Sequence, residues 1–220
     1  MTAQRVQEAI VAVGAQDNDW YAADASHYER PICPAGILSF QPGLFPDWER
    51  FGTRQAFNSR TEWTFFRPMW QGETLTLGMR ISDRWLKRGK EHLTFYMSAR
   101  DAEGKLVAEC RFTETVLAPP EYEPPLICRD SEVSETRATN LAPELGTLSR
   151  TYTVEMSKAL CGGLVDWHTD VKLAQERGFA QPVLLGAQIV CQACELLTRS
   201  YGTGFLEGGQ ISLNVLKPVM

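Results

Sequence analysis

The stretch Pro31-Ile-Cys-Pro-Ala-Gly36-Ile-Leu-Ser-Phe40 has a counterpart late in the chain, Pro182-Val-Leu-Leu-Gly186-Ala-Gln-Ile-Val190. Each begins with a proline, contains a glycine and continues as an apolar run. A second pair follows: residues 62–69 and residues 210–219 both look like strands and end in a basic residue, a proline and an apolar residue. Pro31 and Pro68 are 37 positions apart, and Pro182 and Pro218 are 36 apart. Because unrelated segments rarely agree in both content and spacing, the sequence indicates one structural unit written twice.

The first copy contains three further strand patterns. Apolar and polar residues alternate in residues 73–81, 92–99 and 105–116, as expected of half-buried strands. Asp101-Ala-Glu-Gly104 between the last two is a hairpin turn pattern, in which Gly104 can adopt a positive φ. Consecutive strands joined by short turns form an antiparallel meander, which usually packs one face against a helix.

The second copy contains a clear helix pattern that begins at Gly186 and ends near Gly202. Apolar residues recur at three- and four-residue steps, and we predict that they face the sheet: Ile189, Val190, Ala193, Leu196 and Leu197. Polar residues are predicted to occupy the opposite face of the helix: Gln188, Gln192, Glu195 and Arg199.

Composition excludes several classes of protein. The net charge is −5 over 220 residues and the basic residues are scattered, which argues against a nucleic-acid surface. No stretch approaches the roughly 20 apolar residues of a membrane span. Residues 1–16 are typical of a short amphipathic helix and unlike a signal peptide, so we expect a cytoplasmic protein.

The six cysteines do not require a disulfide framework, because the chain is large enough to build its own core. Cys191 and Cys194 have the spacing of a metal or redox pair but fall inside the predicted helix. With no second pair or nearby histidine to complete a zinc site, buried thiols are the favoured interpretation and no metal is expected.

Three stretches resemble the MaoC-like hydratase and dehydratase family of double hot-dog proteins. Phe66-Arg67-Pro68 with Gly72-Glu-Thr-Leu75 resembles the family's RPxxxGDxL strand. Asp166-Trp-His168-Thr-Asp170, followed by Ala174 and Gly178-Phe179, resembles its HxDxxxA…Gf catalytic turn, and Pro182-Val-Leu-Leu-Gly186 resembles its PxxxG helix start. The resemblance covers about residues 25 to 219.

The resemblance implies an α+β double hot-dog fold, with an antiparallel sheet wrapped around a long central helix in each half. The expected domains are an N-terminal hot-dog (1–117), a Pro-rich linker (118–148) and a C-terminal hot-dog (149–220). The first copy continues about fifty residues past Pro68, whereas two residues follow Pro218. We therefore expect the second half to be truncated, with an incomplete sheet.

The family's activity is the reversible addition of water at the 2,3-position of an acyl thioester, carried by coenzyme A or an acyl carrier. This chemistry uses no cofactor or metal; it needs a base and a donor for the charge on the thioester oxygen. By resemblance His168 takes the position of the base and the Gly186 N–H that of the oxyanion donor. Leu185 and Gly163 are expected near the substrate.

One position departs from the family pattern. The family commonly has Asp or Asn five residues before the histidine, where this chain has Gly163. Asp166 is one substitute, since residues two apart in an extended segment point the same way. Asp170 is another, although it is also placed to cap a helix over residues 171–177. Two structural alternatives stay open: His168 as a structural histidine and Gly186 as a close-packing glycine.

The first copy has no comparable catalytic set. Asp19-Trp20-Tyr21 resembles the order Asp166-Trp167-His168, with Tyr21 where the histidine would be. His27 and His92 lack partners at a recognisable spacing and are predicted to be structural. We expect the first copy to act as a scaffold that widens the acyl pocket.

Two other functions remain open. Gly163 and the early end of the second copy favour a non-catalytic or partner-dependent subunit, assembled as a homo-oligomer or heteromer. Because hot-dog folds host more than one chemistry, an acyl-CoA thioesterase is the other alternative.

Overall fold

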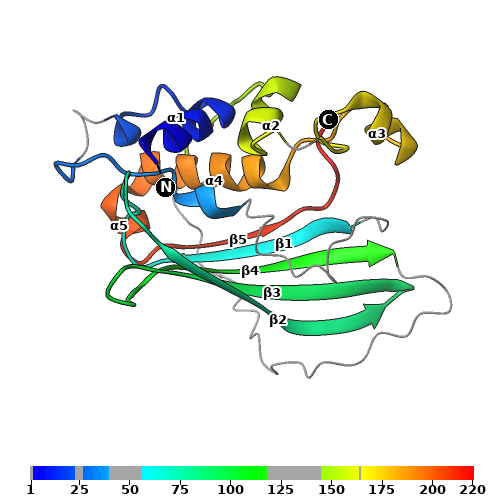
Figure 1. Cartoon of the computed structure of the whole chain (residues 1–220), viewed down its shortest axis with the longest axis horizontal. Helices are drawn as coiled ribbons and strands as arrows, with labels where there is room; N and C mark the ends of the chain where they lie inside the picture. The colour runs from blue at the N-terminus through cyan, green and yellow to red at the C-terminus, as the bar shows by residue number, and fades with distance from the viewer. Residues whose placement is uncertain (1, 23–26, 40–55, 118–144, 164) are drawn as a thin grey trace.

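The computed structural model describes residues 2–22, 27–39, 56–117, 145–163 and 165–220 (Figure 1). The elements of the first half are α1 (Ala3–Ala12), η1 (Asp19–Tyr21), η2 (Ala35–Ser39), β1 (Ala56–Phe65), β2 (Thr76–Lys87), β3 (Lys90–Arg100) and β4 (Leu106–Leu117). Those of the second half are α2 (Val154–Leu160), α3 (Val171–Glu176), α4 (Gly186–Tyr201), α5 (Thr203–Leu206) and β5 (Gln210–Asn214).

The five strands form one antiparallel sheet in the order β2-β3-β4-β1-β5. The predicted meander is confirmed by the adjacent strands β2, β3 and β4. Its second turn closes where predicted, with Gly104 N–H donating to the Asp101 carbonyl at 3.0 Å and φ +78° at Gly104. The side chain of Asp101 also accepts from Lys105 N–H at 2.8 Å, which fixes the turn at both ends.

The strand predicted at residues 62–69 lies further toward the N-terminus, because β1 ends at Phe65 and the chain then leaves the sheet. Arg67 holds this exit by ion pairs to Glu73 and, at 3.2 Å, to Asp101 in the β3–β4 turn. The arginine of the RPxxxGDxL-like stretch therefore has a structural role here: it ties the departure from β1 to the start of β2.

The two halves share the sheet through β1 and β5. In this pairing Glu62 lies opposite Ser212, and these residues are 150 positions apart, as Pro68 and Pro218 are. At the centre of the β1–β5 pairing, a residue of the first copy therefore lies opposite the equivalent residue of the second copy, as a local two-fold axis requires. The two copies of the repeat therefore contribute strands to one continuous sheet.

The helices of the described residues lie on one face of the sheet (Figure 1). α4 lies next to the strands, and α1 and α2 lie outside it. The hydrophobic core draws buried residues from both halves, among them Val6, Trp63, Phe65, Val190 and Leu206. Arg5 of α1 donates from Nη1 to the carbonyl of Ala159 in α2 at 2.7 Å, which joins the outer helices. The halves therefore form one packed body.

Gln188 and Glu195 lie on the polar face of α4, and both side chains are buried. Gln188 donates to the Ala12 carbonyl at 3.0 Å and accepts from Ser157 Oγ at 3.0 Å. Glu195 pairs with Arg150. Because the outer helices cover the side of α4 that faces away from the sheet, its polar residues meet protein partners instead of water. The central helix predicted for the second half is confirmed.

At the corresponding position of the first half the structure describes η2, and residues 40–55, which follow it, lie outside the described residues. Residues 118–144 of the predicted linker, with Cys128, also lie outside them. Within the described ranges, no helix is both long and apolar enough to cross a membrane.

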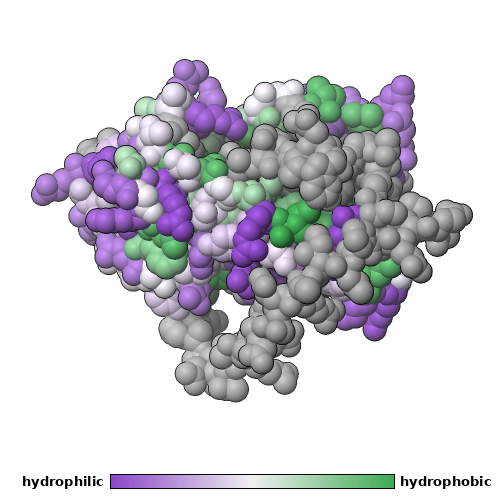
Figure 2. Space-filling model, turned by 60° about the horizontal axis from the view of Figure 1, so that its bottom comes forward, coloured by the Kyte–Doolittle hydropathy of each residue, from purple (hydrophilic) through white to green (hydrophobic). Residues whose placement is uncertain are grey.

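The outer face of the sheet carries paired polar side chains. Tyr96 lies under the guanidinium of Arg80 and donates its hydroxyl to Glu109 at 2.9 Å. Arg60 and Glu62 form an ion pair at 2.9 Å on the same face. In the described part of the view in Figure 2, hydrophilic residues surround separate hydrophobic patches. The inner face, by contrast, holds the core and the candidate site.

Candidate functional site

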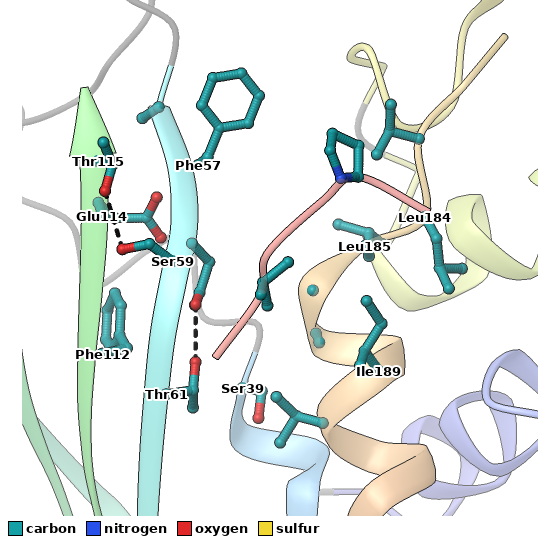
Figure 3. A pocket seen from close by; sticks show the side chains of 18 of the residues that line it. Ser39, Phe57, Ser59, Thr61, Phe112, Glu114, Thr115, Leu184, Leu185 and Ile189 are labelled. Atoms are coloured by element: carbon teal, nitrogen blue, oxygen red, sulfur yellow. Dashed lines mark hydrogen bonds between the residues drawn. The ribbon is translucent and has the colours of Figure 1, made fainter. Parts of the chain in front are cut away.

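A cavity of about 680 Å³ lies between the inner face of the sheet and the beginning of α4 (Figure 3). This volume is within the usual range for small-molecule sites. Both halves line it. Representative residues are Phe57, Asn58, Thr61, Phe112 and Glu114 from the first half, and Trp167, His168, Val183, Leu185 and Gly186 from the second.

His168 lies in a short turn whose backbone is fixed by its neighbours. Asp166 accepts from His168 N–H through its carboxylate at 2.8 Å, and Asp166 N–H donates to Thr169 Oγ1 at 2.9 Å. Asp170 begins α3 by accepting from Leu173 N–H at 3.0 Å, which confirms the predicted cap. The two carboxylates therefore organise the turn that presents the histidine.

The imidazole of His168 has a defined orientation. Nδ1 lies 2.8 Å from the carbonyl oxygen of Val183. Since a carbonyl can only accept, Nδ1 carries the proton and Nε2 of the neutral ring has a free lone pair. Burial lowers the pKa of His168 below its ordinary value, and the Val183 hydrogen bond and the Asp166 charge offset this only in part. The ring is thus neutral at neutral pH.

Aromatic contacts attach this turn to the first half. Trp167 stacks on Phe179 with ring centroids 5.4 Å apart, and it meets the edge of Phe57 of β1 at 5.6 Å. The guanidinium of Arg177 lies 5.7 Å from the centroid of the Trp167 ring. Because aromatic clusters of this kind add packing energy and rigidity, they hold His168 against the cavity wall.

The start of α4 presents backbone amides to the cavity. Leu185 precedes the helix and has no side-chain oxygen to cap it; Gln188 instead accepts from Leu185 N–H at 3.3 Å. The N–H groups of Gly186 and Ala187 have no acceptor among the described residues. Orphan amides at the N-terminus of a 16-residue helix favour a negatively charged group.

The environment of Gly186 also bears on its alternative role in close packing. A Cβ atom placed on Gly186 would lie 3.7 Å from Asn58 Cβ, an ordinary van der Waals distance. The absence of a side chain is therefore not needed to avoid a clash there, and it leaves the helix start open to the cavity.

Three of the residues predicted to form the site line the cavity: His168, Leu185 and Gly186. Asp166 and Asp170 are not among the lining residues; their carboxylates accept from backbone amides. Gly163 lies in the turn after α2, where its N–H donates to the Lys158 carbonyl at 3.0 Å and its φ is +83°. A glycine relieves strain at that backbone conformation, and the position does not line the cavity.

Sequence reasoning missed Glu114. Cys110, Phe112 and Val116 mark the inward positions of β4, and Glu114 occupies the inward position between the last two. A charged residue that interrupts an apolar alternation was the available indication. Asn58 was missed because residues 56–61 lack such a pattern.

The favoured interpretation of the cysteine pair agrees with the structure. Cys191 and Cys194 are both buried in α4. Burial raises the pKa of Cys191 to about 12 and that of Cys194 well above its ordinary range. Their thiols are therefore protonated in this environment.

No family model matches the chain, and no curated protein matches it in sequence. Solved structures do match in fold. A MaoC-like dehydratase from Phytophthora capsici matches with a TM-score of 0.67 at 15% identity, over 100% of this chain and 79% of that one.

Two further structures agree. The peroxisomal multifunctional enzyme type 2 of Drosophila melanogaster has a TM-score of 0.70 at 14% identity, over 100% of this chain and 40% of that one. A conserved hypothetical protein of Mycobacterium tuberculosis with a double hotdog fold has a TM-score of 0.59 at 15% identity, over 100% and 76%. At these identities the likeness concerns the fold. The chain therefore has the double hot-dog fold that the MaoC-like dehydratases also have.

Proposed function

We propose that this protein adds water to, or removes it from, the 2,3-position of an acyl thioester. The observation that carries the proposal is the unprotonated Nε2 of His168, in a cavity that also receives the orphan amides at the start of α4. Supporting it is the double hot-dog fold, which MaoC-like dehydratases share.

In the hydration direction, His168 Nε2 takes a proton from water as the water oxygen bonds to C3 of the enoyl thioester. The electron pair of the C2–C3 double bond moves toward the thioester oxygen, which the Gly186 N–H stabilises. The imidazolium then returns a proton from Nε2 to C2. Its Nδ1–H remains bound to the Val183 carbonyl, which favours the charged ring while it lasts. Dehydration is the reverse.

The halves have different roles in this proposal. The C-terminal hot-dog, 149–220, supplies the base and the helix start, and the N-terminal hot-dog, 1–117, supplies the opposite wall of the acyl pocket. Asp166 acts on His168 through its backbone and through its charge, which raises the pKa of the ring. Asp170 acts by capping α3.

The test is the loss of the ultraviolet absorbance of a conjugated enoyl-CoA when purified protein is added. We expect turnover by the wild type and its loss in His168→Gln. His27→Gln is the matched control, since His27 is exposed and does not line the cavity. An unchanged absorbance with every enoyl-CoA from four to twelve carbons would refute hydration.

A thioesterase is the second candidate, because Glu114 places in the same cavity a carboxyl that could activate water. It would release free coenzyme A, which a thiol reagent detects in parallel with the absorbance assay. Thiol release without prior hydration would favour this reaction.

We also propose that the protein assembles as a homo-oligomer or a heteromer. β2 and β5 are the edge strands of the described sheet, and an unpaired strand edge is a site of association. Light scattering after size exclusion tests this: a monodisperse, active monomer would overturn it.

A further inference from the structure

Glu114 is placed unusually for a carboxyl. It lies on β4 with Asn58 of β1 and Leu93 of β3 as its neighbours across the ladder. Leu93 is fully buried. Glu114 points from β4 into the region between the sheet and the start of α4 and lines the cavity there (Figure 3). An ionisable group thus stands at an inward position of the sheet.

Several polar groups around it form hydrogen bonds with one another. Thr115 Oγ1 donates to Ser59 Oγ at 2.9 Å, and Thr61 Oγ1 donates to Asn58 Oδ1 at 2.9 Å (Figure 3). Glu114 has no hydrogen-bond or ion-pair partner among the described residues. Enclosing a carboxyl without a partner is unfavourable, and burial raises its pKa to about 7. The group is therefore available to a ligand that fills the cavity.

The ladder also places Glu114 relative to the proposed reaction centre. A Cβ on Gly186 would lie 3.7 Å from Asn58 Cβ. Asn58 lies opposite Glu114, and opposed side chains on neighbouring strands begin about 5 Å apart. An acyl chain held at Gly186 therefore reaches Glu114 within roughly four to eight carbons, since an extended chain advances by about 1.2 Å per bond.

We propose that Glu114 binds a hydroxyl group on the acyl chain, so that this site selects hydroxylated acyl thioesters over plain alkyl ones of the same length. A hydroxyl both donates and accepts, so it can bind the carboxyl in either protonation state. An ammonium group would require the ionised form alone. The proposal rests on the proposed function only in naming a thioester as the ligand.

Binding tests it without turnover. The probes are saturated ω-hydroxyacyl-CoA thioesters of four to eight carbons, each compared by calorimetry with the alkanoyl-CoA of equal length. In the wild type we expect the hydroxylated probe to bind about 10-fold tighter at one or two lengths, the effect of one hydrogen bond to an ionisable group. Glu114→Leu should abolish that preference. Glu109→Leu, on the outer face of the same strand, should keep it.

Because Glu114→Leu could fold poorly, a second measurement uses the wild type: the carboxyl of Glu114, followed by carbon NMR, should shift its pH titration when the preferred probe binds and not when its alkanoyl match binds. Equal affinities in both series at every length, retention of the preference in Glu114→Leu, or no binding of any probe would each overturn the proposal.

The two proposals fail separately. Selective binding without hydration of any enoyl-CoA would sink the proposed function and leave this assignment standing. Hydration without any preference for the hydroxylated probes would support the proposed function and overturn the assignment of Glu114. If Glu114→Gln loses all turnover while binding stays unselective, Glu114 takes part in the chemistry and the assignment is wrong.

Discussion

Gly36 and Gly186 hold the same place in the two copies and have opposite surroundings. A Cβ on Gly36 would lie 2.9 Å from the backbone Cα of Cys191, whereas the nearest atom to one on Gly186 is 3.7 Å away. The first helix start is pressed against α4 of the other half, and the second faces the cavity. Equivalent backbone positions thus became a packing contact in one half and an open site in the other.

Tyr21 and His168 also hold equivalent places in the two copies and have different surroundings. Tyr21 is 4% exposed and belongs to the core, and burial raises the pKa of its phenol well above the ordinary value. His168 is half-buried and lines the cavity. The residue that follows the shared Asp-Trp pair is therefore a core side chain in the first half and a cavity-lining histidine in the second.

The largest expected effect is the difference in enzymatic activity between substitutions of these two residues. His168→Ala should lower kcat/KM for an enoyl-CoA by about 100- to 10,000-fold, the usual contribution of a general base. Tyr21→Phe should stay within about three-fold of wild type. Both are measured by the absorbance assay after circular dichroism shows native folding. A comparable loss in Tyr21→Phe would mean that the first half takes part in the chemistry.

The glycines should differ in stability. In Gly36→Ala the new methyl meets the backbone of α4, which cannot move easily, so we expect about 1–3 kcal/mol of destabilisation. Gly186→Ala places its methyl at van der Waals distance, and the change should be within about 1 kcal/mol, in either direction. Urea unfolding measures both. Equal losses would show that Gly186 is also a packing contact.

The raised pKa of Glu114 should appear as a pH dependence of the protein's stability. Its pKa rises from 4.5 to about 7 on folding, so the folded state holds this proton more tightly and stability falls as pH rises across that window. Above pH 7 the full cost remains. Glu114→Gln lacks this cost and should be more stable than wild type by about 1–2 kcal/mol at pH 8, a difference that vanishes below pH 4.5.

Other side chains that can carry a charge line the same cavity, among them Lys90, His168 and Lys217. They are present in both proteins, so the wild-type-minus-variant difference isolates Glu114. A constant difference from pH 4 to pH 8 would contradict the raised pKa.

Asp166 should show the smallest effect. Asp166→Asn can still accept the His168 N–H, so the turn is kept, but it removes a charge that raises the pKa of the ring. We expect the acid limb of the pH–rate profile to move to lower pH by less than about one unit, with kcat/KM at pH 8 within about three-fold. A hundred-fold loss would instead make Asp166 a chemical partner of His168.

The sequence predicted those features that short-range patterns determine. Alternation located β2, β3 and β4, glycine and aspartate marked the turn at Asp101–Gly104, and the three- and four-residue spacing located α4. The resemblance to the MaoC-like family singled out His168 and Gly186, and both line the cavity. These features depend on neighbours within a few residues of one another.

Long-range packing could not be predicted in the same way. Periodicity placed Gln188 on the polar face of α4, but it does not reveal that a second layer of helices covers this face. The carbonyl that orients His168 comes from Val183, fifteen positions later, and backbone partners leave no trace in residue type. Glu114 joins the site only through the register of β4 against β1.

The pairing of β5 with β1 has a consequence for folding. The two strands are about 150 positions apart in sequence, and contacts of such long separation slow folding because much chain must be ordered before they form. At a synthesis rate of about 5–20 residues per second, roughly 8–30 s pass on the ribosome between the synthesis of β1 and that of β5. Its edge is unpaired by β5 in that interval, when edge-to-edge aggregation is the competing event. Expression at low temperature, or with chaperones, should therefore raise the yield of folded protein.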